Sequence, residues 1–410
     1  MKLELIATAT FGLEAVVRRE IEALGFKITE GEDGRVTYVT NEAGLARSNL
    51  WLRCADRVLL KMGAFEALTF EDLFQGMRAL PWETLIPPDG NFVVNASSVK
   101  SKLSSVPSCQ SVAEKALVMR LSDAYGMQEF EKEALNKEAM LEYDDGFDAF
   151  RGEKQLFPKS GAKYAVQLRI LKDRVTVAVD TSGAGLHKRG YRTQQTEAPI
   201  KETLAAALVS LSFWKPGRLL ADPLCGSGTI PIEAAMIGRG IAPGLGRKFA
   251  AEAWSFVPQE VWKRERAEAY KRIDLNADVR ILASDRSGEA IRIARENAEN
   301  AGVDDCIEFS RRTFSEFAAD VATCGVIVTN PPYGERIGEL PEVEGLYREI
   351  GAFMQANPAW SLFLITTYKD FETLAFGRPA DRRRKLYNGR LETTFYQYHG
   401  EKPASTRPAR

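Results

Sequence analysis

Residues 218–238 read RLLADPLCGSGTIPIEAAMIG, and no other stretch determines the fold as narrowly. The apolar run that ends at Asp222 is typical of a buried β-strand, the glycines that follow indicate a tight loop, and a helical pattern begins at Thr229. Downstream, strands are predicted at 280–285, 306–310, 325–330 and 361–368, with helical stretches between most of them. This alternation predicts an α/β fold with a doubly wound parallel sheet.

The part of the chain before residue 196 has a different pattern. Residues 1–50 read as strand, helix and strand, and residues 51–157 as a mixed stretch of both elements. Residues 165–180 alternate around Lys172-Asp173, which predicts a β-hairpin, and the polar, basic residues 181–195 are the best linker candidate. We therefore expect an N-terminal α+β part, a hairpin with a linker at 158–195, and a C-terminal domain at 196–400. Asn388-Gly389 predicts a second hairpin near the end of that domain.

Composition excludes several classes of protein. The 410 residues suffice for two or three domains, and the formal net charge of −1 means that a nucleic acid could bind only through local basic patches. The five cysteines are far apart and there are only two histidines, so we expect neither a disulfide framework nor a metal site. No apolar run of roughly 18 residues and no signal-like start occur, so we expect no membrane segment and a cytoplasmic location.

The loop after the strand at 218–222 is a candidate cofactor site. Ligands of open α/β sheets bind beyond the carboxyl ends of the strands, where glycine lets the backbone approach closely. The alternative is a tight strand-to-helix turn without a ligand, since the G-x-G pattern lacks the third glycine of a dinucleotide fingerprint. We favour the cofactor loop, whose candidate contacts are Asp222, Cys225, Gly226, Ser227, Gly228 and Thr229.

Two residues of this region need a separate interpretation. Asp285 ends the next predicted strand, where its carboxylate can accept hydrogen bonds from both hydroxyls of a ribose. Its alternative role is to cap the helix that begins near residues 287–289. Cys225 is expected to be a small side chain in the loop and not a covalent nucleophile.

Asn330-Pro331-Pro332-Tyr333 follows the predicted strand at 325–329. Consecutive prolines fix the backbone and remove two amide donors, which leaves the Pro331 carbonyl as an acceptor. That oxygen and the side-chain carbonyl of Asn330 can accept the two hydrogens of a base amino group, while Tyr333 offers a flat face for stacking the base. We expect these three residues to be catalytic, because they aim the amino nitrogen at a methyl donor. The alternative is an Asn-Pro turn with a core tyrosine.

Taken together, these motifs resemble those of the THUMP-domain RNA methyltransferases, close to the bacterial 23S rRNA guanine-N2-methyltransferases. The matching stretches are ATATFGLEAVVRRE (7–20), SVPSCQSVAEKA (105–116), DTSGAGLHKRGYR (180–192), DPLCGSGTIPIEAA (222–235) and NPPYGERIG (330–338). The resemblance implies a ferredoxin-like region at 1–50, a THUMP RNA-binding domain at 51–157 and a Rossmann-like methyltransferase domain at 196–400.

The resemblance also implies roles for single residues. The aspartate-glycine loop would bind S-adenosylmethionine, Asp285 would hold its ribose, and the NPPY motif would hold the target base. The sequence departs from the family where an aspartate is often found near the cofactor adenine. Residues 311–314 read RRTF here, and Thr313 is the candidate replacement.

Two basic clusters are candidates for RNA contacts. The first comprises His187, Lys188, Arg189 and Arg192, and the second Arg382, Arg383, Arg384 and Lys385. Such runs are more often solvated surface, and His187 could instead pack at a domain junction. In an RNA-modifying protein we favour phosphate contacts for both clusters.

The leading hypothesis is therefore methyl transfer from S-adenosylmethionine to the N2 amino group of a guanine in 23S rRNA. The same chemistry on tRNA and adenine-N6 methylation of RNA or DNA remain alternatives, because NPPY does not separate guanine from adenine. From another class, the chain could be a non-catalytic RNA-binding or ribosome assembly factor. A nucleotide-dependent oxidoreductase is disfavoured by the missing third glycine.

Overall fold

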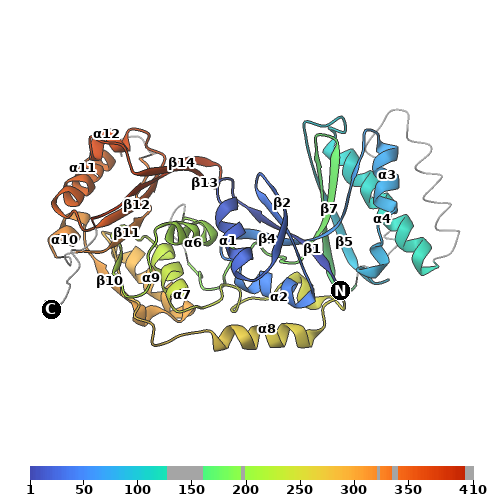
Figure 1. Cartoon of the computed structure of the whole chain (residues 1–410), viewed down its shortest axis with the longest axis horizontal. Coiled ribbons are helices and arrows are strands. Elements are labelled where there is room, and N and C mark those ends of the chain that lie inside the picture. Colours follow the sequence, from blue (N-terminus) through green and yellow to red (C-terminus); the bar gives the residue numbers. More distant parts are fainter. Residues whose placement is uncertain (127–159, 195–198, 321–323, 335–339, 402–410) are drawn as a thin grey trace, which may run out of the picture.

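The computed structural model describes residues 1–126, 160–194, 199–320, 324–334 and 340–401 of the chain. These residues form two seven-stranded sheets that lie in separate lobes of an elongated molecule (Figure 1). The N-terminal lobe contains the first sheet, and the C-terminal lobe contains the second.

The first sheet joins the N-terminal region to the segment that follows it. Its strands lie in the order β2 (Lys27–Glu32), β3 (Arg35–Thr40), β1 (Leu3–Ala9), β4 (Ala55–Glu66), β7 (Arg174–Asp180), β6 (Lys163–Leu171) and β5 (Asn91–Val99). The hairpin expected at 165–180 is confirmed as β6 and β7, and its turn residues Lys172 and Asp173 both have positive φ. This hairpin is part of the sheet, because β7 pairs with β4 and β6 pairs in parallel with β5.

Helices cover the first sheet at two places. The amphipathic helix α1 (Glu14–Ala23) buries Val16, Val17 and Ile21. Helix α2 (Glu42–Trp51) follows, and its amino end is capped by Asn41. Further along, α3 (Phe70–Arg78) and α4 (Val106–Tyr125) pack against each other and against β4 and β5.

The second sheet confirms the predicted α/β fold. Its strands lie in the order β10 (Ile307–Arg311), β9 (Ile281–Asp285), β8 (Leu220–Asp222), β11 (Val326–Thr329), β12 (Ser361–Thr366), β14 (Leu391–Tyr398) and β13 (Arg382–Asn388). The first five strands are parallel, and β14 and β13 add an antiparallel hairpin at the edge. The hairpin turn lies one residue later than predicted, because Asn388 pairs with Leu391 and the turn is formed by Gly389 and Arg390.

Helices lie on both faces of the second sheet, as a doubly wound fold requires. One group comprises α6 (Glu202–Leu211), α7 (Thr229–Gly238) and α9 (Gly288–Ala301), and the other comprises α10 (Phe314–Ala319), α11 (Leu340–Ala356) and α12 (Phe371–Ala375). Helix α8 (Gln259–Lys271) runs along the lower side of the molecule in Figure 1 and packs against α2 of the other lobe. Short 3-10 turns occur at Trp82–Thr84, Ala250–Ala253 and Asp304–Cys306.

Candidate active site

The loops that carry the sequence motifs leave the same edge of the second sheet. Strand β8 lies between β9 and β11, and all three run in parallel. Their carboxyl ends are Asp222, Asp285 and Thr329, and Asn330 follows directly. The aspartate-glycine loop and the NPPY loop therefore begin on neighbouring strands, at the edge where open α/β sheets bind ligands.

Asp222 links these two loops through its carboxylate. The Thr329 hydroxyl donates to Asp222 Oδ1 at 2.7 Å, and the backbone N–H of Leu224 donates to the same oxygen at 3.3 Å. Asp222 is buried, and this burial raises the pKa of its carboxyl to about 7, although the Thr329 hydrogen bond lowers the pKa in part. A buried carboxyl of this kind is suited to a positively charged ligand.

The glycine loop is held against the end of β9. Gly226 and Gly228 both have positive φ, and a Cβ atom on Gly228 would lie 3.0 Å from the Cβ of Ala294 on helix α9. The Gly226 N–H donates to Asp285 Oδ2 at 3.0 Å. Glycine therefore allows the loop to take this conformation close to the neighbouring helix.

Asp285 does not cap helix α9, which was its alternative role. The N-cap residue is Ser287, whose hydroxyl accepts the N–H of Ala290. Asp285 Oδ1 instead accepts the N–H of Ser287 at 2.8 Å. A carboxylate has about four acceptor positions, so capacity remains for further donors such as hydroxyl groups.

Cys225 is packed inside the same loop. Its backbone N–H donates to the Ser284 carbonyl at 2.9 Å. Burial raises the pKa of the Cys225 thiol well above its usual value, so the reactive thiolate is not formed at neutral pH. This environment agrees with the interpretation of Cys225 as a small loop side chain. Two further loop residues are anchored from outside, since Asn297 Nδ2 donates to the Ser227 carbonyl and Arg192 Nη2 to the Thr229 hydroxyl.

The NPPY loop is fixed from two sides. The Tyr333 hydroxyl donates to Asn330 Oδ1 at 2.6 Å, and Asn388 Nδ2 on β13 donates to the Tyr333 hydroxyl at 3.4 Å. The Tyr347 hydroxyl donates to the Pro332 carbonyl at 3.2 Å. Within the described residues no donor contacts the Pro331 carbonyl, so this oxygen is available as an acceptor. Asn330 Oδ1, the other expected acceptor, lies on the same loop, whose backbone the two prolines restrict.

Three residues that support the site were missed by the sequence reasoning: Thr329, Tyr347 and Asn388. Each contacts a motif residue that is close in space through strand or helix packing. Only Thr329 had a sequence signal, because it directly precedes the NPPY motif at the end of a strand.

Thr313, the candidate replacement near the cofactor adenine, caps helix α10. Its hydroxyl accepts the N–H of Glu316, and the Glu316 carboxylate accepts the N–H of Thr313 at 2.7 Å. This reciprocal arrangement is a capping box. The adenine contact of Thr313 stays a prediction.

Two basic residues that were expected to bind RNA form ion pairs within the protein, and only Arg189 of the two is buried. Arg189 is buried and forms an ion pair with Glu233, with Nε at 3.2 Å from Oε1. Arg192 pairs with Glu202 and donates to the Ile200 carbonyl. A buried guanidinium that is already paired is not available to a phosphate, so the expected RNA contact of Arg189 is wrong and its role is structural. The RNA contact of Arg192 stays a prediction.

The other members of the two clusters lie nearer the surface. His187 is half-buried, and desolvation by this burial lowers its pKa, which favours the neutral imidazole. Lys188 is exposed. On β13, Arg383 pairs with Glu372 and Lys385 with Glu392, and within the described residues no carboxylate pairs with Arg382 or Arg384.

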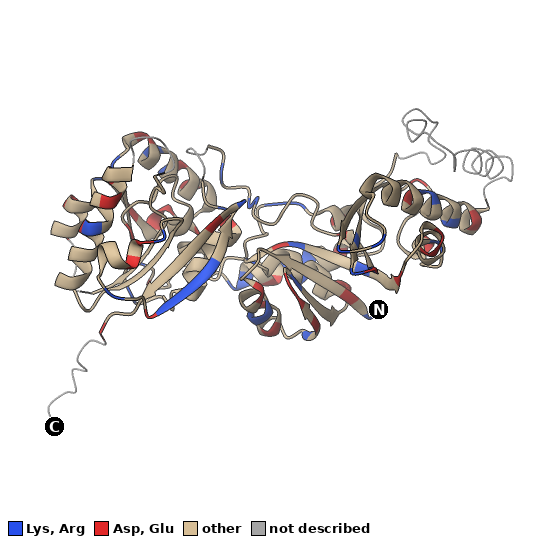
Figure 2. Ribbon diagram, turned by 90° about the horizontal axis from the view of Figure 1, so that it is seen from above, with Lys and Arg blue, Asp and Glu red and all other residues tan. Residues whose placement is uncertain are grey.

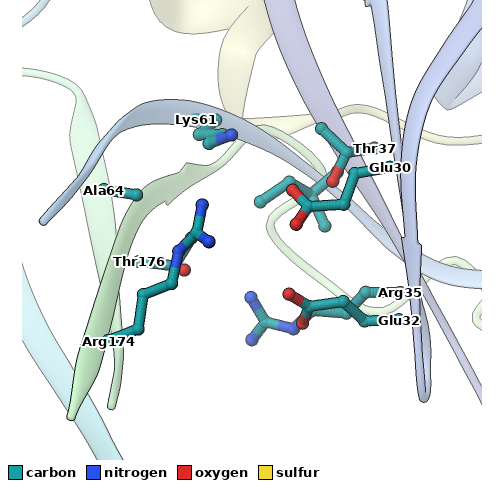
Figure 3. A pocket seen from close by; sticks show the side chains of 9 residues that line it. Glu30, Glu32, Arg35, Thr37, Lys61, Ala64, Arg174 and Thr176 are labelled. Atoms are coloured by element: carbon teal, nitrogen blue, oxygen red, sulfur yellow. The ribbon is translucent and has the colours of Figure 1, made fainter. Parts of the chain in front are cut away.

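Two recesses lie on the surface of the described residues. One lies between the N-terminal region and the β13–β14 hairpin and is lined by Thr10, Phe11, Tyr387 and Gly389. The other lies on the first sheet, where carboxylates and cations face each other, as Figure 3 shows. The second recess is lined by Ile6, Glu30, Glu32, Arg35, Thr37, Lys61, Ala64, Arg174 and Thr176. Its mixed charges do not favour an anion.

Among the residues with described positions, no three His, Cys, Asp or Glu side chains lie close enough together to hold a metal ion. None of the helices in the same parts of the chain is long and apolar enough to cross a membrane.

Three family models match consecutive parts of the chain. Residues 4–59 match an RlmL ferredoxin-like domain, residues 67–126 a THUMP domain, and residues 189–397 an RMKL-like methyltransferase domain. The last match includes the aspartate-glycine loop, Asp285 and the NPPY motif.

Curated relatives match nearly the whole chain. The "Putative RNA methyltransferase YpsC" of Bacillus subtilis is 42% identical over 97% of this chain and 96% of its own length. The "Ribosomal RNA large subunit methyltransferase K/L" of Psychromonas ingrahamii is 35% identical over 94% of this chain. The chain spans only about half of that relative, 49% of its length.

Solved structures agree with these matches. A "possible methylase" from Clostridium difficile 630 has a TM-score of 0.87 at 44% identity, covering 98% of this chain and 100% of that one. A methyltransferase that was crystallised with SAH has a TM-score of 0.85 at 40% identity, covering 98% and 99% of the two chains.

Proposed function

The chain belongs to the RMKL-like methyltransferase family, and we propose that it methylates the N2 amino group of a guanine in 23S rRNA. The observation that supports this most directly is the 2.7 Å hydrogen bond between Asp222 and Thr329. It joins the loop that would hold the cofactor to the residue that directly precedes Asn330. The methyl donor and the base amino group would then meet at the edge that both loops share.

The residues of the aspartate-glycine loop fit S-adenosylmethionine, which supplies a methyl group on a positively charged sulfur. Asp222 and Asp285 place two carboxylates beside the loop, a charge that suits this cation. Asp285 has remaining acceptor positions for the ribose hydroxyls. In the same family, the structure with bound SAH is consistent with this cofactor.

The NPPY loop would orient the base. Asn330 Oδ1 and the Pro331 carbonyl accept the two hydrogens of the amino group, so that the nitrogen lone pair faces the methyl carbon. The N–C bond forms as the C–S bond breaks, and the nitrogen then loses a proton to water. Tyr333, which now donates to Asn330 Oδ1, would stack on the base. Most of the rate enhancement then comes from positioning by a preorganised loop.

The choice of 23S rRNA rests on the THUMP match and on the names of relatives such as the enzyme from Psychromonas ingrahamii. A ribosomal RNA substrate would place the chain in the cytoplasm. Methylation of tRNA uses the same geometry on another RNA, and methylation of adenine N6 in RNA or DNA uses it on another base.

Nucleoside mass spectrometry of rRNA and tRNA from a deletion strain tests the proposal. We expect N2-methylguanosine to decrease in 23S rRNA and to return when the wild-type gene is restored. Loss of a tRNA mark with unchanged rRNA would reject the 23S substrate, and loss of N6-methyladenosine would reject guanine. If the purified chain binds no S-adenosylhomocysteine in calorimetry, a non-catalytic RNA-binding role is favoured instead.

A further inference from the structure

An open recess of about 440 Å³ lies where the N-terminal region meets the β13–β14 hairpin. Two of its four lining residues are aromatic. Phe11 and Tyr387 lie edge to face with ring centroids 6.0 Å apart, and Phe11 is 50% exposed. A phenylalanine that keeps half of its surface in water has apolar area available for a ligand.

The recess is held in place by a close backbone contact. Gly12 has a φ of +90°, and a Cβ atom there would lie 2.7 Å from the Lys385 carbonyl oxygen on β13. Beside it, the side chain of Leu386 is fully buried. Glycine thus allows the loop that carries Phe11 to lie directly against the edge strand of the second sheet.

The recess adjoins the NPPY loop. Tyr387 contacts Phe11, and the next residue on the strand, Asn388, donates to the Tyr333 hydroxyl. Tyr333 in turn donates to Asn330. Two consecutive residues of β13 therefore contact the two features: Tyr387 lines the aromatic recess, and Asn388 contacts the loop proposed to hold the target base.

The surroundings carry positive charge that suits a nucleic acid. The Lys385 ammonium lies 5.7 Å from the centre of the Tyr387 ring and is paired with Glu392 at 2.7 Å. Arg382 and Arg384 lie on the same strand, which appears as a basic edge strand in Figure 2, and Arg390 lies in the turn. Within the described residues none of these three arginines pairs with a carboxylate. Phosphates could bind these arginines while a base occupies the aromatic recess.

We propose that Phe11 and Tyr387 form a stacking platform for an RNA base that flanks the target nucleotide. The N-terminal region would then take part in substrate positioning at the active site. This inference rests on the proposed RNA methyltransferase function and adds a site for a neighbouring nucleotide. Stacking of a base on an aromatic ring is sequence-tolerant, so the platform positions the RNA and does not select the base.

The test uses the full-length protein with Phe11→Leu, Phe11→Trp and Tyr387→Leu. Leucine keeps apolar bulk but removes the flat ring, whereas tryptophan keeps a ring. The matched control is Tyr270→Ala, because Tyr270 is a 60% exposed aromatic residue on helix α8. Initial rates of methyl transfer are measured on in vitro transcribed 23S rRNA and on unmodified tRNA, and S-adenosylhomocysteine binding is measured by calorimetry.

For both leucine variants we expect the KM for RNA to rise about tenfold, as the loss of one stacked base implies. The kcat and the affinity for S-adenosylhomocysteine should stay close to those of the wild type. Phe11→Trp and Tyr270→Ala should keep the wild-type KM. A wild-type KM in both leucine variants, or a fall in kcat without a change in KM, would overturn the proposal. If the wild-type protein itself methylates neither RNA, the proposed function fails instead.

Discussion

At the scale of single residues, Asp222 is the buried carboxyl that connects the two loops of the proposed site. Its carboxyl is buried, its pKa is raised to about 7 by that burial, and its hydrogen bonds come from Thr329 and the backbone of Leu224. At neutral pH the carboxyl is therefore close to its midpoint of ionisation. A positively charged cofactor would favour the ionised form and lower this pKa.

The affinity for S-adenosylmethionine, which carries the sulfonium charge, is therefore expected to depend on pH. Below pH 7 a proton must leave Asp222 on binding, so affinity should rise about tenfold per pH unit from pH 5 to pH 7 and level off above it. Calorimetry at several pH values measures this slope. In Asp222→Asn the binding should be weaker and the slope should disappear. An equal slope in the wild type and in the variant would contradict the assignment.

Asn330 is expected to act on transfer and not on cofactor binding. Asn330→Ala removes one of two acceptors for the base amino group, and loss of such a positioned group typically costs about 10²–10³-fold in kcat. The affinity for S-adenosylhomocysteine should be unchanged. The control is Asn357→Ala, which removes a hydrogen bond to the Phe353 carbonyl at the end of helix α11. An Asn330→Ala protein with full activity would disprove the proposed contact to the base.

At the scale of elements, the pairing of β8 with β11 brings the two loops together. Only two residue pairs of these strands are in register, and the Asp222–Thr329 hydrogen bond continues the contact beyond them. Because this bond favours the ionised carboxylate, its contribution to stability is larger where Asp222 is charged.

Thr329→Val should therefore destabilise the protein in a pH-dependent way. The pKa of Asp222 should rise further, because the hydrogen bond that lowers it is removed. A raised pKa in the folded state means that stability is lost as the pH rises through that pKa. We expect the free energy of unfolding to fall by about 1–3 kcal/mol at pH 8 and by less at pH 5. Denaturant unfolding at the two pH values measures the difference.

Thr393→Val is the control for that experiment, because Thr393 is also buried and its hydroxyl donates to the Leu386 carbonyl. In Thr393→Val the free energy of unfolding should fall by a similar amount at pH 5 and pH 8. A pH-independent loss in Thr329→Val as well would contradict the role given to this bond.

The elements also show what the sequence could predict. The apolar strands and the glycine loop at 218–238 were enough to predict a doubly wound sheet, because their patterns are local. The turn at Lys172-Asp173 was predicted for the same reason. The parallel pairing of β5 with β6 depends on contacts between distant segments, and no local pattern indicates it. The same holds for the contact of Asn388 with Tyr333.

The burial of basic residues is the feature that the sequence predicted least well. The run at 187–192 contains exposed Lys188 and buried Arg189 side by side, and their order in the sequence does not reveal which one is buried. The partner of Arg189 is Glu233, 44 residues further along the chain. Burial of a charge is decided by such distant partners.

At the scale of the whole molecule, Arg189 connects the two lobes through hydrogen bonds to each of them. Its guanidinium donates to Glu233 on α7, to the Leu186 carbonyl in the linker and to the Arg53 carbonyl of the N-terminal lobe. Arg247 adds to this junction, because its guanidinium donates to linker carbonyls such as that of Gly185 at 2.6 Å. A fixed junction would keep Phe11 beside the active site of the other lobe.

Arg189→Ala should destabilise the protein strongly, because it leaves the Glu233 carboxylate buried without its partner. The expected loss is about 3–5 kcal/mol in the free energy of unfolding, measured by chemical denaturation. The control Arg264→Ala removes an exposed arginine and should change stability by less than about 0.5 kcal/mol. If Arg189→Ala instead kept full stability and weakened only RNA binding, the original assignment of this residue to RNA would be right.

The central claim is that the two loops form one site for methyl transfer to a base amino group in RNA. Its most direct test incubates the purified protein with RNA from a deletion strain and S-adenosylmethionine that carries a deuterated methyl group. Mass spectrometry of the digested nucleosides then locates the label. We predict deuterium-labelled N2-methylguanosine from 23S rRNA with the wild-type protein, and an initial rate of labelling about 10²–10³-fold lower with Asn330→Ala. Label on a ring carbon or a ribose, or no labelled nucleoside from any RNA, would contradict the claim.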